Sequence, residues 1–247
     1  MLQIERLVVS YGGDPVINDF SLQVPEGSFV GLVGPNGAGK TTLMLAASGQ
    51  LQPASGQVHF GGEDVYAHNL RFKRRMGFVH EEPFFYPQLT VAEFMRFVAE
   101  VKRIPAGKQE DEVAARLETV MWREPRSKRV ADLSMGMRKK LAIAAAMLAH
   151  PRILFLDEAL NGIDIESAFQ IKSHLKTYAR EGGIVILSTH VLDVVEKLCT
   201  RYLILQNGRV LSDLDAAEFA DLRENGRAPD LESYIMELLH GASGPGA

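Results

Sequence analysis

The first stretch able to do chemistry is the nine-residue loop Gly34-Pro35-Asn36-Gly37-Ala38-Gly39-Lys40-Thr41-Thr42. It fits the phosphate-binding pattern G-x-x-x-x-G-K-S/T at every fixed position. Glycines let such a loop curl so that successive backbone N–H groups point at phosphate oxygens, and a helix N-terminus adds positive dipole. In this chemistry Lys40 reaches the β- and γ-phosphates and the Thr41 hydroxyl binds Mg²⁺.

The residues around this loop predict the local structure that it needs. Ser28-Phe29-Val30-Gly31-Leu32-Val33 is a short apolar run typical of a buried strand, and a helical pattern begins with Leu43, Met44, Ala46 and Ala47. A glycine-rich turn that binds nothing is the alternative. The change from a predicted strand to a predicted helix at this loop favours a phosphate-binding loop over a turn that binds nothing.

A second group that could do chemistry is the acidic pair Asp157-Glu158. It follows the apolar run Ile153-Leu154-Phe155-Leu156, which predicts a central parallel strand covered on both faces. The carboxylates then lie at the C-terminal edge of the sheet, where open α/β folds bind ligands. The pair could instead cap the following helix. Beside a phosphate loop, Asp157 is a candidate Mg²⁺ ligand and Glu158 a candidate general base that polarises water.

Two isolated residues have weaker signals. Tyr11 ends the first predicted strand, where an exposed aromatic ring can stack on a nucleotide base, although a tyrosine beside a turn more often packs against its neighbours. His190 follows the apolar run Gly183–Leu187, and a lone histidine at a strand end is usually structural.

Composition limits the class of protein. The chain has 247 residues, with 46% hydrophobic and 23% charged residues, as in a globular protein with a full core. A net charge of −4 argues against a general nucleic-acid binder. Cys199 is the only cysteine, which excludes an internal disulfide and suits a reducing compartment. We expect no signal peptide and no transmembrane segment, because the longest apolar run, Leu141–Ala149, is far shorter than a membrane span.

The remaining patterns predict the elements that position these residues. Two-residue hairpins are expected at Gly61-Gly62 and at Asn207-Gly208. The capping-box sequence Thr90-Val91-Ala92-Glu93 opens a helix whose predicted apolar side is Phe94, Phe97, Val98 and Val101. Further helices are expected from three apolar faces: Val113, Leu117 and Val120; the Ala-rich segment Arg138–Ala149; and Leu231, Tyr234, Ile235, Leu238 and Leu239.

The order of these motifs resembles the nucleotide-binding subunit of an ATP-binding cassette (ABC) transporter, over nearly the whole chain. Most specific is Leu133-Ser134-Met135-Gly136-Met137-Arg138, which is similar to the signature sequence of that family. Gly162-Ile163-Asp164 resembles the loop that crosses the dimer interface, Tyr11 the adenine-stacking aromatic residue, and His190 the switch histidine.

The resemblance implies roles for particular residues. Lys40, Glu81, Glu158 and His190 are implied to be catalytic, and Thr41, Asp157 and Glu81 to hold Mg²⁺. Ser134, Met135, Gly136 and Met137 would contact the ATP of a partner cassette, and Asp164 would lie in the dimer interface. The residues implied to bind ATP are Tyr11, Val16, Gly34, Pro35, Asn36, Gly37, Ala38, Gly39, Lys40, Thr41 and Thr42.

The resemblance also implies architecture and partners. The expected fold is α/β: a phosphate-loop NTPase core with a mixed central sheet, an N-terminal antiparallel β region and a helical insert. We expect one ABC ATPase domain over 1–247, with a catalytic core of 1–85 and 150–214, a helical subdomain at 86–149 and a helical tail at 215–247. Two such subunits, identical or related, would sandwich two ATP molecules head to tail and drive a separate membrane permease from the cytoplasmic face, favouring export over import.

Three residues depart from the family pattern. Glu81 stands where the family normally has Gln, and the carboxylate adds negative charge beside Glu158 and the γ-phosphate. Met137 replaces the usual Gln of the signature, and Ala159 replaces the Pro that usually follows the catalytic Glu. The loops are similar to those of Ecs-type bacterial transporter ATPases, which also place Glu at the position of Glu81.

Two alternative functions remain open at this stage. A regulatory cassette with low ATPase activity would fit Glu81 and Met137. A soluble ABC protein acting in DNA repair or on ribosomes would normally carry a long coiled-coil insert or two fused cassettes, and basic surfaces. This chain has a single cassette, a short insert and net acidity, which favour the transporter subunit.

Overall fold

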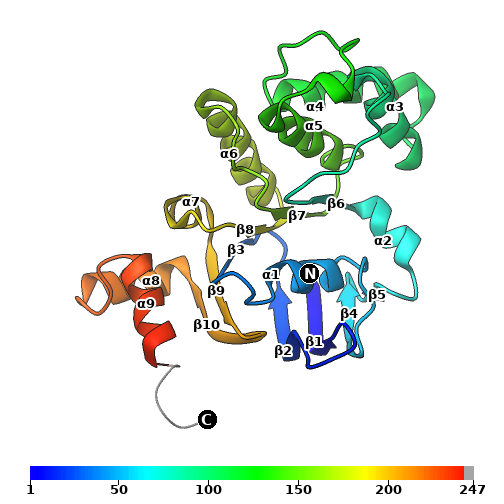
Figure 1. Ribbon diagram of the computed structural model, residues 1–247. Helices are drawn as coiled ribbons and strands as arrows, with labels where there is room; N and C mark the ends of the chain where they lie inside the picture. The colour runs from blue at the N-terminus through cyan, green and yellow to red at the C-terminus, as the bar shows by residue number, and fades with distance from the viewer. Residues whose placement is uncertain (242–247) are drawn as a thin grey trace.

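The computed structural model describes residues 1–241, which form two β-sheets and the helices that cover them (Figure 1). The smaller sheet is antiparallel and N-terminal, with strand order β2-β1-β4-β5. Its strands are β1 (Leu2–Val9), β2 (Ile17–Val24), β4 (Ser55–Phe60) and β5 (Glu63–Asp64). Apolar and polar residues alternate along β1 and β2, so one face of the sheet is buried and the other faces solvent.

The larger sheet is mixed, with strand order β10-β9-β3-β8-β7-β6. Its strands are β3 (Phe29–Val33), β6 (Met76–Val79), β7 (Ile153–Asp157), β8 (Ile184–Ser188), β9 (Arg201–Gln206) and β10 (Arg209–Asp215). All neighbours pair in parallel except β9 and β10, which are antiparallel. Strands β3, β7 and β8 are buried throughout, as expected for strands covered on both faces. The predicted α/β fold with a mixed central sheet is confirmed.

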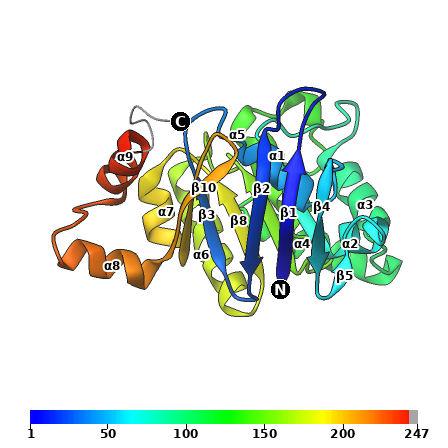
Figure 2. The ribbon, with the colours of Figure 1, turned by 90° about the horizontal axis from the view of Figure 1, so that it is seen from below.

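Helix α1 (Lys40–Ala47) joins the two sheets, because it packs against β1 of one and against β7 and β8 of the other. Its side chains Leu43 and Met44 are buried in the same apolar cluster as Phe155 and Ile186 of the mixed sheet. In Figure 2 the antiparallel strands β1 and β2 lie in front of the mixed sheet. The start of α1 is therefore fixed from two sides.

Three helices gather beyond the β6 edge of the mixed sheet (Figure 1). They are α3 (Val91–Val101), α4 (Ala106–Thr119) and α5 (Met135–Ala146), which pack on one another while α5 also packs on β6. The short helix α2 (Asn69–Arg75) precedes β6, and a 3-10 turn, Val130–Asp132, precedes α5. The Thr90–Glu93 capping box at the start of α3 is confirmed.

The predicted apolar side of α3 is partly wrong. Phe94 is buried, but Phe97 and Val101 are 42% and 57% exposed, and the buried side also contains Val91, Met95 and Ala99. Apolar residues occur on most of this helix, so periodicity alone permits two overlapping stripes. Packing against α4 and α5 selects the stripe that includes Met95 and Ala99.

Helix α5 begins and ends three residues earlier than predicted. Ser134 caps it by accepting a hydrogen bond from the Met137 backbone N–H at 3.3 Å, so Met135 is already helical. At the other end Ala149 and His150 have left-handed φ values of 62° and 47°, which a helix does not permit. The signature-like residues Met135 and Met137 thus lie in the first turn of α5 instead of in a preceding loop.

The C-terminal part carries α6 (Ile165–Arg180), α7 (Leu192–Leu198), α8 (Ala216–Glu224) and α9 (Leu231–Gly241). Both predicted hairpin turns are present, with left-handed φ values of 60° and 81° at Gly61-Gly62 and 49° and 72° at Asn207-Gly208. Leu231 and Ile235 of α9 are buried and the helix packs on α7, as predicted for the tail. Residues 242–247 of that tail lie outside the described residues.

Candidate functional site

The phosphate-loop sequence connects β3 to α1 and closes over its own lysine. Lys40 Nζ donates hydrogen bonds to the carbonyls of Gly34 at 2.7 Å and Pro35 at 3.0 Å. Gly39 has φ of 99°, and a Cβ added there would lie 2.7 Å from Ile17 Cδ1, so the turn requires glycine. Burial lowers the pKa of Lys40, while the carboxylates of Glu158, Asp157 and Glu81 act in the opposite direction.

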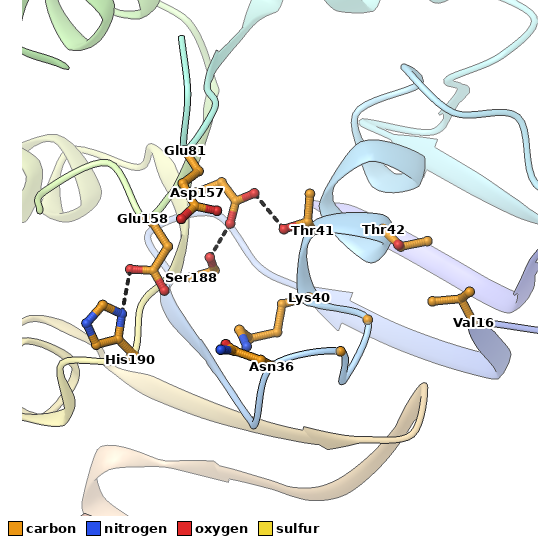
Figure 3. A pocket seen from close by; sticks show the side chains of 12 residues that line it. Val16, Asn36, Lys40, Thr41, Thr42, Glu81, Asp157, Glu158, Ser188 and His190 are labelled. Atoms are coloured by element: carbon orange, nitrogen blue, oxygen red, sulfur yellow. Dashed lines mark hydrogen bonds and ion pairs between the residues drawn. The ribbon is translucent and has the colours of Figure 1, made fainter. Parts of the chain in front are cut away.

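Two hydroxyl groups hold the carboxylate of Asp157 at the end of β7 (Figure 3). Thr41 Oγ1 donates to Asp157 Oδ2 at 2.7 Å, and Ser188 Oγ donates to Asp157 Oδ1. Asp157 and Ser188 are buried, so both carboxylate oxygens have a donor inside the protein. The parallel register pairs Asp157 with Ser188, which explains their meeting.

Glu158 is oriented through its side chain by two residues of neighbouring loops. Its Oε2 accepts a hydrogen bond from Asn161 Nδ2 at 2.7 Å. The same oxygen lies 3.2 Å from His190 Nδ1 (Figure 3). The Glu158 side chain is 13% exposed and that of His190 70% exposed, so the histidine reaches the carboxylate from the solvent side. The contact brings together the ends of β7 and β8.

One cavity of about 530 Å³ lies at the C-terminal edge of the mixed sheet (Figure 3). The predicted site residues that line it are Val16, Asn36, Gly37, Gly39, Lys40, Thr41, Thr42, Glu81, Asp157, Glu158 and His190. Ser188 lines it too and was missed by sequence reasoning. The signal that could have found Ser188 is its place at the end of the strand next to β7.

Four predicted nucleotide-binding residues lie around the cavity without lining it. Gly34 and Pro35 face Lys40 with their carbonyls, and Ala38 is buried beneath the loop. Tyr11 is 63% exposed, and its hydroxyl lies 3.3 Å from Thr42 Oγ1. The ring of Tyr11 is therefore free on the surface beside the start of α1.

The signature-like residues are not part of this cavity. Ser134 caps α5, and Gly136 packs so closely on the next loop that an added Cβ would lie 2.4 Å from the Gly162 carbonyl. The Asp164 side chain caps α6 by accepting a hydrogen bond from the Ser167 backbone N–H at 2.9 Å. Asp164 is exposed to solvent. Hydrogen bonds from Ser167 lower the pKa of Asp164. The fold thus places the signature and Asp164 together, away from Lys40.

The oxygen atoms of the cavity are of the type that binds Mg²⁺ together with a phosphate. Thr41, Asp157 and Glu81 supply hydroxyl and carboxylate oxygens, the donor type that Mg²⁺ prefers. Within residues 1–241 no group of three or more His, Cys, Asp or Glu side chains is arranged to hold a metal by itself. Mg²⁺ commonly combines one or two carboxylates with substrate phosphates and water, which is what this cavity could offer.

The fold and the cavity together define a class. A loop of this form between a buried parallel strand and a helix, with Asp157 and Glu158 on the adjacent strand edge, is that of a phosphate-loop nucleotide-binding ATPase. A family model described as ABC transporter matches residues 17–161. The chain belongs to the ABC transporter family and is an ABC ATPase.

Relatives in sequence agree with this assignment. The chain is 37% identical over 218 residues to the uncharacterized ABC transporter ATP-binding protein YdbJ of Bacillus subtilis, covering 87% of this chain and 69% of that protein. It is 32% identical over 245 residues to the Nod factor export ATP-binding protein I of Cupriavidus pinatubonensis, covering 99% of this chain and 75% of that protein.

Solved structures show the same fold. An ATP-binding subunit of an ABC transporter matches with a TM-score of 0.89 and 27% identity, covering 97% of this chain and 99% of that one. A dimeric ATP-binding cassette in a post-hydrolysis state with ADP and Pi matches with a TM-score of 0.80 and 21% identity, covering 87% of this chain. Among residues 1–241, no helix has both the length and the apolar character needed to span a membrane.

Proposed function

We propose that this chain is the ATP-hydrolysing subunit of a membrane transporter and that Glu158 is the general base for cleavage of the β–γ bond. The observation that carries this proposal is the position of Glu158 at the rim of the cavity, oriented by Asn161 and His190 and opposite the phosphate loop. A carboxylate held in place beside a bound water can act as the general base that takes its proton.

The residues of the cavity have separate roles in this proposal. Lys40 exchanges its carbonyl partners for β- and γ-phosphate oxygens, and the backbone N–H groups of the loop bind the remaining phosphate charge. Thr41, Asp157 and Glu81 would hold Mg²⁺, which when bound neutralises charge on the phosphate oxygens. Glu158 accepts a proton from the attacking water, and His190 contacts the γ-phosphate from the open side.

The position of the signature residues supports a dimer of cassettes. Ser134 and Gly136 lie away from the cavity of their own chain, at the N-terminus of a helix that can bind an anion. They complete an ATP site only if a second copy or a related cassette presents them to it. We infer a head-to-tail dimer in which Asp164 lies at the interface and loss of the γ-phosphate separates the halves.

A groove between β6, α3 and α5 supports docking of a permease. It has a volume of about 440 Å³ and is lined by the aromatic residues Phe78, Phe84, Phe85 and Phe94. Phe84 is 81% exposed, and the loop that carries it begins beside Glu81 of the nucleotide cavity. An apolar segment of a membrane permease seated here would contact the loop that lines the ATP site. The protein would then be peripheral, at the cytoplasmic face of the membrane.

Export is the proposed direction, because one relative in sequence is the Nod factor export ATP-binding protein I of Cupriavidus pinatubonensis. The transported substrate is selected mainly by the permease.

The decisive experiment replaces Glu158 with Gln. Phosphate release should fall by about 100-fold or more, since a positioned general base supplies that order of acceleration. Binding of Mg-ATP should persist, and size-exclusion chromatography with ATP should show a trapped dimer. Glu118→Gln, an exposed substitution on α4, is the matched control and should hydrolyse ATP normally. Normal hydrolysis by Glu158→Gln would contradict the assignment, and absent hydrolysis by the unaltered protein would indicate a regulatory cassette.

A further inference from the structure

Lys139 is a buried lysine that contacts the backbone of the catalytic glutamate. It lies in the second turn of α5, is 5% exposed, and its Nζ donates a hydrogen bond to the Glu158 carbonyl oxygen at 2.7 Å. A charged amine is rarely buried without a strong acceptor, because losing its hydration is costly. The Glu158 carbonyl oxygen therefore supplies the acceptor that this buried lysine needs.

The carbonyl that Lys139 contacts belongs to a residue with an unfavourable backbone conformation. Glu158 has φ of 45°, in the left-handed region that is unfavourable for a non-glycine residue. Its N–H, in the peptide group before its Cα, donates to the Ser188 carbonyl at 3.1 Å. Lys139 binds the carbonyl of the peptide group after that Cα, so the direction of the side chain of Glu158 depends on two backbone contacts from different elements.

The helix that carries Lys139 is itself held against the loop that follows Glu158. The next residue, Lys140, donates to Ser167 Oγ at 2.8 Å, and Gly136 packs against the Gly162 carbonyl. Lys139 and Lys140 thus join α5 to both ends of the segment between β7 and α6. A movement of α5 would be transmitted directly to the backbone of Glu158.

We propose that Lys139 is a positioning residue for ATP hydrolysis: it holds the backbone of Glu158 so that the carboxylate points at the attacking water. This inference rests on the proposed role of Glu158 as general base. Because α5 begins at the signature residue Ser134, the same contact would make the base of each chain sensitive to what its own signature binds on the partner cassette.

The test compares Lys139→Met and Lys139→Gln in the full-length protein. Methionine and glutamine both end one bond short of the lysine amine; methionine donates nothing, whereas glutamine keeps an N–H donor. We expect kcat to fall by about 10- to 100-fold with Met, as a misplaced catalytic group does, and less with Gln. The KM for ATP and the affinity for Mg-ATP should stay within about twofold, because Lys139 does not line the nucleotide cavity.

The matched control removes another buried bond to a backbone carbonyl. Tyr178→Phe deletes the 3.0 Å hydrogen bond from Tyr178 Oη to the Pro151 carbonyl, and neither residue lines the nucleotide cavity. It should lower thermal stability without changing kcat. The proposal would be overturned if Lys139→Met had the same kcat as the unaltered protein, or if its affinity for ATP fell together with kcat.

Combination with Glu158→Gln separates positioning from general stabilisation. If Lys139 acts through Glu158, adding Lys139→Met to Glu158→Gln should leave the residual kcat unchanged, whereas independent effects multiply. Multiplying losses would overturn the proposal. If Lys139→Met does not fold, as judged by circular dichroism, Lys139→Gln alone decides by the same two measurements.

The two hypotheses fail in different ways. If Glu158→Gln hydrolyses ATP normally, the proposed role of Glu158 is wrong. If Glu158→Gln is inactive but both Lys139 variants keep the full kcat, only the role of Lys139 is wrong.

Discussion

Thr41 and Asp157 lie 116 positions apart in the sequence, yet Thr41 Oγ1 donates a hydrogen bond to Asp157 Oδ2 at 2.7 Å. The bond links the first turn of α1 to the end of β7, and thereby the phosphate loop to the acidic strand. Both atoms are of the type that binds Mg²⁺, so the two protein oxygens expected on the metal are already adjacent.

The stability of this pair should depend on Ser188. Its hydroxyl is fully buried and donates to the other oxygen of Asp157. Ser188→Ala leaves that buried oxygen without this donor, so the free energy of unfolding should fall by about 1–3 kcal/mol. Urea denaturation measures it. Ser212→Ala, which removes the 2.9 Å contact between the hydroxyls of Ser212 and Tyr234, should cost about 1 kcal/mol or less. An equal or smaller loss at Ser188 would contradict the expected role.

The exposed ring of Tyr11 should contribute to the binding of the adenine base. Tyr11→Ala should raise the Kd for ATP by about 5- to 150-fold, which corresponds to the roughly 1–3 kcal/mol of a base stacked on an aromatic ring. Tyr11→Phe is the matched variant, since it keeps the ring and loses only the contact with the Thr42 hydroxyl. Fluorescent-nucleotide titration distinguishes them. A Phe variant as weak as the Ala variant would show that the hydroxyl matters instead of the ring.

Glu81 should act mainly through the metal. It lines the cavity together with Asp157 and Glu158, whereas the adjacent Glu82 does not. Glu81→Gln removes one carboxylate from the proposed Mg²⁺ site, so half-maximal turnover should require about tenfold more Mg²⁺. Glu82→Gln should leave the requirement unchanged. Unchanged metal requirement and turnover in Glu81→Gln would remove any special role for this carboxylate.

Lys102 should make stability depend on pH in the alkaline range. It donates to the backbone carbonyls of Lys73 and Met76, and burial lowers its pKa from 10.5 to about 8. Between pH 8 and 10.5 the unfolded chain keeps the proton that the folded protein releases, so this lysine makes folding more favourable as the pH rises. Below pH 8 both states carry the charge, and the cost of burying it is fully present.

The measurement compares the unaltered protein with Lys102→Met by urea denaturation at pH 7 and pH 10. The unfolding free energy of the unaltered protein, relative to the variant, should rise by up to about 3 kcal/mol between these values. Lys108→Met, a substitution of an exposed lysine on α4, should show no comparable pH dependence. A flat difference for Lys102 would mean that its amine remains hydrated.

Local sequence chemistry predicted part of this protein well. The turns at Gly61-Gly62 and Asn207-Gly208 need left-handed backbone, which glycine and asparagine adopt most easily, so they are readable without knowing the rest of the fold. The buried strand β7 and the phosphate loop are likewise encoded in consecutive residues. Most residues predicted for the nucleotide cavity do line it, because motif residues at adjacent strand ends meet at one sheet edge.

Other features depended on contacts between distant segments. The buried side of α3 was settled by its packing on α4 and α5, since its sequence is apolar on too many sides to specify one. The early start of α5 is by contrast a local feature, because Ser134 caps the helix through the Met137 N–H three residues further on.

The sequence by itself determined the class of chemistry, because phosphate binding and acid–base catalysis need particular side chains at short, fixed spacings. Only the tertiary structure decided which further residues serve that chemistry. Ser188 reaches Asp157 from 31 positions away, and Lys139 of helix α5 reaches the backbone of Glu158, which follows β7. Such partners cannot be recognised from neighbouring residues in the sequence. Any strand register or helix packing that brings a hydrogen-bond donor to the right point could hold the same group.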